Sequence, residues 1–186
     1  MRTVGMVRTI VGLLLFSLVG AAMAQEGNVR RYPLPNHGTI QLQAPASWKD
    51  ELRQPPNALP PTIAYKPQSG APFEVLLTPI WPASKNASPA GPDALRKMVQ
   101  NAADQAKSQA VEKMIALKEL KGTSGLGYYF SATDRAPAPG EYKHLTQGIM
   151  RVGELIVTFT ILTNDAQEKI VADAIATLMS ARHVGN

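Results

Sequence analysis

The chain contains no cysteine among its 186 residues, which excludes disulfide bonds, thiolate metal sites and cysteine nucleophiles. It has only three histidines, and none is followed at the third or fourth position by another histidine or a carboxylate. That spacing would place two metal ligands on one helix face. We therefore expect no metal site and no cofactor, and the sequence holds no assembled catalytic motif.

The chain also has few aromatic residues and no cluster of charges of one sign. Aromatic residues make up 6% of the chain, and the formal net charge is only +5. The basic residues are scattered, without a block of five or six like charges. Nucleic-acid binding favours a clustered basic face, so we expect no nucleic-acid partner.

The first 24 residues have the pattern of a secretory signal peptide. Arg2 and Arg8 supply positive charge, residues 10–22 are almost wholly apolar, and small residues flank Met23. We expect cleavage after Ala24 and a periplasmic or secreted location. Later apolar runs are too short for a spanning helix, so we expect no stable membrane span after cleavage.

Residues 25–38 are polar and are expected to be a flexible lead-in, followed by a single domain over residues 39–186. In the sequence, 13 of the 15 prolines lie between Pro33 and Pro92, which favours turns and short strands there. The predicted early strands cover residues 39–44, 62–66 and 73–81, with residues 47–61 as a connection.

Helical periodicity marks two later segments. The first begins at Pro92 behind Gly91 and is expected to end between Ala110 and Met114. Its predicted buried stripe is Leu95, Met98, Val99, Ala102 and Ala106. The second helix is expected to be capped by Asn164 with Gln167. Its predicted stripe is Ile170, Val171, Ala174, Ile175, Leu178 and Met179.

Between these helices the pattern is that of a sheet. Strands are predicted over residues 115–121, 126–133, 142–152 and 155–163, and the last is apolar on both faces, as in a covered central strand. The order of the predicted elements is strands, a helix, strands and a second helix, and this order indicates an α+β domain. We expect one antiparallel sheet with two long helices packed on it.

The opening strand carries a family resemblance. Gly38-Thr-Ile-Gln-Leu-Gln43 leads into Pro45-Ala-Ser-Trp48, and the order of elements over residues 38–182 resembles the PsbP-like proteins. This resemblance implies an antiparallel sheet between helices, an α/β/α sandwich, and a role in binding or assembly. It implies no catalytic residues, and Trp48 corresponds only to a packing residue.

Three functional hypotheses follow. The first is an exported non-enzymatic binding or accessory protein that contacts a protein partner in the cell envelope. Its candidate surface gathers aromatic residues and a histidine at one end of the sheet: Trp81, Tyr128, Tyr129, Tyr142 and His144. The second is a periplasmic small-molecule carrier with a pocket lined by Met98, Tyr128 and Phe159. The third is a hydrolase of unknown substrate that uses Ser124 or the carboxylates of Asp134 and Glu154.

Overall fold

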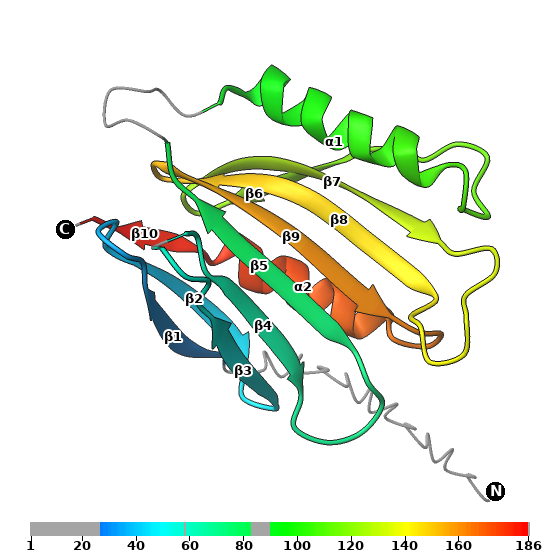
Figure 1. Cartoon of the computed structure of the whole chain (residues 1–186), viewed down its shortest axis with the longest axis horizontal. Coiled ribbons are helices and arrows are strands. Elements are labelled where there is room, and N and C mark those ends of the chain that lie inside the picture. The colour runs from blue at the N-terminus through cyan, green and yellow to red at the C-terminus, as the bar shows by residue number, and fades with distance from the viewer. Residues whose placement is uncertain (1–26, 58, 83–89, 186) are drawn as a thin grey trace, which may run out of the picture.

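Two antiparallel sheets and two helices form the described part of the chain, residues 27–57, 59–82 and 90–185 of a computed structural model (Figure 1). The expected signal peptide lies outside these residues. The strands are β1 (Gly27–Pro33), β2 (Thr39–Pro45), β3 (Trp48–Arg53), β4 (Thr62–Pro67), β5 (Glu74–Ile80), β6 (Lys118–Gly122), β7 (Gly125–Thr133), β8 (His144–Val152), β9 (Leu155–Thr163) and β10 (Arg182–Val184). The helices are α1 (Pro92–Ala106) and α2 (Glu168–Met179).

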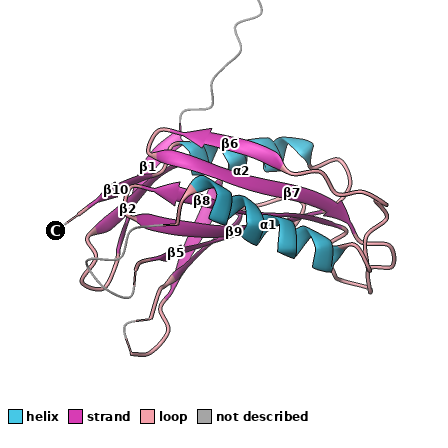
Figure 2. Ribbon diagram, turned by 90° about the horizontal axis from the view of Figure 1, so that it is seen from above, coloured by secondary structure: helices cyan, strands magenta, loops and turns pink. Residues whose placement is uncertain are grey.

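The larger sheet has seven strands in the order β3-β4-β5-β9-β8-β7-β6, and the smaller has the order β1-β2-β10. Helix α1 packs on β7 and β8, whereas α2 contacts β2, β6 and β9. The two helices lie on opposite sides of the larger sheet (Figure 2). The predicted α+β class is therefore confirmed, but the prediction of one sheet is wrong, because β1, β2 and β10 form a second one.

The main core lies between the larger sheet, α2 and the smaller sheet. In β9 every second side chain is buried in it, including Val157, Phe159 and Ile161. The residues between them are only half-buried, so this central strand is fully covered on one face rather than on both. Helix α2 buries Ala174 and Leu178 as expected, but Met179 is exposed.

Three strands escaped prediction, and all of them lie at the margins of the sheets. Residues 25–38 were expected to be a flexible lead-in, yet they contain β1, and residues 47–61 contain β3. Strand β10 follows α2 and pairs with β2. An edge strand pairs on one side only, and its charged residues can face water, so the apolar alternation that identifies a strand is weak. In β3, Trp48 alone is buried.

Helix α1 begins at Pro92 as predicted but ends at Ala106, before the expected range. The chain then turns and pairs with the end of β7. The amide of Val111 donates to the Thr133 carbonyl at 2.8 Å, and the amide of Arg135 donates to the Gln109 carbonyl at 2.9 Å. These long-range hydrogen bonds replace helical ones. The buried stripe of α1 is Leu95, Val99 and Ala103, whereas Met98 is 51% exposed.

Neither helix within the described ranges combines the length and apolar character that crossing a membrane requires.

Candidate functional site

One face of the larger sheet is only half covered. Helix α1 packs over β7 and β8, and no described helix lies over β5 and β9 on that side. Strand register places Leu162 beside Leu145 and Thr158 beside Ile149. Leu145 and Ile149 pack in the smaller hydrophobic cluster, which lies under α1. We call the uncovered area the open face. Its residues are Thr62 of β4, Leu76, Thr78 and Ile80 of β5, and Ile156, Thr158, Thr160 and Leu162 of β9.

The open face combines aliphatic side chains with a group of threonines. Ile80 is 39% exposed, and the other members are half-buried. The hydroxyls of Thr62 and Thr78 share a hydrogen bond of 2.9 Å across β4 and β5. Ion pairs of Glu74 with Arg53 and Lys66 border this floor on the β3 side. An apolar centre with a charged rim is the anatomy of many protein interfaces.

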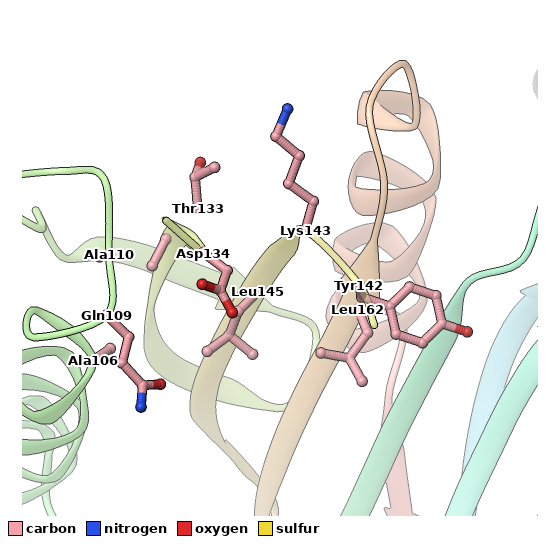
Figure 3. A pocket seen from close by; sticks show the side chains of 10 residues that line it. Ala106, Gln109, Ala110, Thr133, Asp134, Tyr142, Lys143, Leu145 and Leu162 are labelled. Atoms are coloured by element: carbon pink, nitrogen blue, oxygen red, sulfur yellow. The ribbon is translucent and has the colours of Figure 1, made fainter. Parts of the chain in front are cut away.

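A pocket of about 210 Å³, which we call the end pocket, lies where the open face meets the end of α1 (Figure 3). Leu145 and Leu162 line its floor, and Gln109 lies on the side of α1. The carboxylate of Asp134 is directed into this space, whereas Lys143 extends away from it. The end pocket is therefore apolar below and carries a negative charge at its rim.

A second pocket, of about 320 Å³, lies on the opposite face between the first turn of α2 and the ends of β7 and β8. We call it the α2 pocket. Four hydroxyl side chains line it: Ser131, Thr133, Thr146 and Thr163. The other polar side chains of its lining are Glu112, His144, Asn164, Gln167 and Glu168.

A chain of hydrogen bonds crosses the rim of the α2 pocket. Thr133 donates its amide at 2.9 Å and its hydroxyl at 2.8 Å to the Glu112 carboxylate. The same hydroxyl lies 3.2 Å from Nδ1 of His144, whose Nε2 lies 2.9 Å from Asp165. Lys143 donates to the other oxygen of Asp165 at 2.8 Å. The Thr133 hydroxyl thus lies between Glu112 and His144, and Asp165 lies between His144 and Lys143.

The carboxylates of Glu112 and Asp165, which both belong to this hydrogen-bond network, favour the charged form. Burial raises the pKa of Glu112, but the hydrogen bonds from Thr133 outweigh it and leave that pKa below its usual value. The pKa of Asp165 is lowered chiefly by the hydrogen bond from Lys143 and then by the one from His144. In the described ranges, no group of three or more acidic or histidine side chains could hold a metal ion.

The aromatic residues predicted to gather at one end of the sheet do not form one surface. Tyr128 packs in the cluster under α1, whereas Tyr129 packs against Phe159 on the other face, with ring centroids 6.4 Å apart. Trp81 follows β5 near the start of β9 and stacks on His37 at 4.3 Å.

Tyr142 and His144 lie at the other end, because His144 pairs with Thr163 at the end of β9. Adjacent strand residues point to opposite faces, so Tyr128 and Tyr129 could not share a surface.

The predicted carrier pocket is not formed by its three residues. Phe159 is buried in the main core on the α2 side, Tyr128 lies under α1, and Met98 is exposed. The two pockets near the ends of β7 and β8 use other residues.

The predicted hydrolytic carboxylates do not converge. Asp134 follows the end of β7, and Glu154 lies in the turn before β9, at the other end of the nine-residue strands. At about 3.3 Å per residue, a strand of this length separates them by roughly 26 Å. Ser124 shares a pocket of about 330 Å³ with Glu154 and Arg151 near the start of α1.

Sequence reasoning missed Glu112 and Thr133, which line the α2 pocket, and Asp165, which bonds to His144 at its rim. These residues lie in different segments, and the pairing of β7 with β8, of β8 with β9 and of β7 with the segment after α1 brings them together. A local sequence pattern does not predict which distant segments pair, so it could not identify these residues as neighbours.

No protein-family model and no curated protein matches this chain. Among solved structures it is similar to the cyanobacterial PsbP protein (CyanoP) of Synechocystis sp. PCC 6803, with a TM-score of 0.49 and 12% identity. The match covers 91% of this chain and 99% of that one. That solved structure is a PsbP protein, the kind of protein that the sequence of this chain resembles.

Proposed function

We propose that this chain is an exported, non-enzymatic binding protein that acts through protein–protein contacts in the cell envelope. The open face is the observation that carries the proposal. Export rests on the signal-peptide pattern of residues 1–24.

The composition of the open face supports a protein partner. Leu76, Ile156 and Leu162 present apolar surface beside threonine hydroxyls in the middle of the larger sheet. Covering apolar surface contributes about 25 cal/mol per Å² removed from water. A broad floor with ion pairs along one border suits a protein surface better than a small ligand, which favours a concave site.

Capture from an envelope extract tests the proposal. The wild-type protein should retain a specific partner, and Thr160→Lys should lose it, because the lysine places a charge in the centre of the open face. Asn101→Lys adds the same charge on the exposed side of α1 and should retain the partner. Thermal unfolding of each variant verifies that the fold is intact. Equal capture by wild type and Thr160→Lys, or no specific capture by wild type, would contradict the proposal.

A second candidate function is a small-molecule carrier, and the α2 pocket is the observation that favours it. Its hydroxyl groups and the Glu112 carboxylate suit a polar ligand of a size that about 320 Å³ can hold. Native mass spectrometry of the purified protein tests this function. A bound mass that Thr146→Val removes would support a carrier, and a protein that is always empty would argue against it.

A further inference from the structure

We infer that the end pocket receives the side chain of a lysine or arginine from the protein partner. This inference rests on the proposed function and names the chemistry that the partner presents at one point. It follows from the shape of the end pocket, from its charge and from its position beside the open face.

The floor of the end pocket suits the stem of a long cationic side chain. Leu145 and Leu162 form the floor, and Ala106 and Ala132 lie beside them. Lysine and arginine pack their methylene groups on apolar surface while the charged end stays polar. The volume of about 210 Å³ leaves room for one extended side chain.

Asp134 supplies the charge that would meet the cationic end. Its Oδ1 accepts a hydrogen bond from the amide of Ala136 at 2.9 Å. Among the described residues, no cation forms an ion pair with this carboxylate, and Oδ2 accepts no hydrogen bond. Figure 3 shows the carboxylate directed toward the space above Leu145. A carboxylate in this position can accept charge-assisted hydrogen bonds from an ammonium or a guanidinium group.

The cations nearest to Asp134 in the sequence are engaged elsewhere. Lys143 forms its ion pair with Asp165 at 2.8 Å and extends away from the end pocket. Arg135 donates to the carbonyl of Ala110 at 2.7 Å. The negative charge at the rim is therefore not neutralised from within the described chain.

The position of the end pocket links it to the open face, because Leu162 belongs to both. A partner that lies across β5 and β9 would pass this opening. One basic side chain could then anchor the partner at the edge of the contact, where a charged pair contributes to specificity.

Capped amino acids test the inference without knowledge of the partner. We expect N-acetyl-lysine-amide to shift the NMR amide signals of Asp134, Leu145 and Leu162. N-acetyl-norleucine-amide has a similar apolar stem without the charge and should bind more weakly, and N-acetyl-glutamate-amide should give no shifts at these positions.

Two matched variants distinguish a specific ion pair between Asp134 and the lysine probe from a general effect of negative charge near the end pocket. Asp134→Asn should weaken binding of the lysine probe about tenfold, because the charged hydrogen bond is lost. Glu141→Gln removes an exposed carboxylate of the same connection and should leave binding unchanged. Equal binding by wild type and Asp134→Asn, or an equal loss in Glu141→Gln, would overturn the inference. If Thr160→Lys abolishes partner capture and Asp134→Asn does not weaken it, the proposed function stands and the lysine site is wrong.

Discussion

A methyl group at Gly148 should destabilise this protein strongly, although it is the smallest possible addition. Gly148 lies in the middle of β8, paired with Tyr129 of β7 and Phe159 of β9. An added Cβ would lie 2.5 Å from Cζ of Phe159 and 2.6 Å from Cβ of Tyr129, and it would overlap the carbonyl oxygen of Tyr128. Both aromatic side chains thus occupy the space that a side chain at position 148 would need.

The size of the effect follows from these distances. Carbon atoms pack best at about 3.5–4.0 Å, so the new methyl group would overlap its neighbours by roughly 1 Å. The Phe159 ring lies in the main core and cannot swing toward water, and the Tyr128 oxygen belongs to the backbone. Replacing glycine by alanine in a strand usually gains ~0.5–1 kcal/mol. Overpacking should outweigh that gain, for a net loss of about 2 kcal/mol in the free energy of unfolding.

Urea denaturation followed by circular dichroism measures this loss. Gly148→Ala should lower the midpoint without changing the m-value. Gly185→Ala is the matched control, because a Cβ there meets no atom within 4 Å, and its stability should change by less than ~0.5 kcal/mol. Combining Gly148→Ala with Phe159→Leu should recover part of the loss relative to Phe159→Leu alone. A Gly148→Ala protein as stable as wild type would refute the packing argument.

Two further predictions concern polar contacts. Because the pKa of Glu112 is lowered in the folded protein, its contribution is present above the unfolded pKa of about 4.5 and is lost as the pH falls through the lower, folded value. Urea unfolding from pH 7 to pH 2 should therefore show a smaller acid loss in Glu112→Gln than in wild type, and identical pH profiles would contradict this. Arg30, which donates to Asp50 and to the carbonyls of Pro45 and Trp48, links β1 to β3. Arg30→Met should cost about 2 kcal/mol in the same assay, and a loss near zero would argue against the link.

The regular elements were predictable where a repeating pattern of side chains coincides with burial. The alternation over residues 155–163 matches β9 at both ends, and Gly91 with Pro92 marks the start of α1. A side-chain pattern did not reveal β3, because its charged side chains face water and only the pairing with β4 defines the strand. The predicted end of α1 was too late, because the apolar pattern of the sequence continues after the chain has turned toward β7.

The candidate sites depended much less on local pattern. Asp134 was predicted as one of two hydrolytic carboxylates, whereas its place above Leu145 and Leu162 follows from the pairing of β7 with β8 and of β8 with β9. The prediction that the aromatic residues gather on one surface was wrong. Tyr128 and Tyr129 point to opposite faces, and the long-range pairing of the strands places Trp81 and Tyr142 at opposite ends of the sheet.

Amino-acid order alone established an α+β chain with two helices and an alternating central strand, because helix and strand periodicities are local properties of side-chain spacing. Which half of the sheet α1 covers, and therefore which aliphatic and threonine side chains remain on the open face, was decided by long-range pairing. The same holds for the end pocket. Residues from α1, β7, β8 and β9 meet there only because antiparallel pairing fixes their register, and that register is a property of the folded chain.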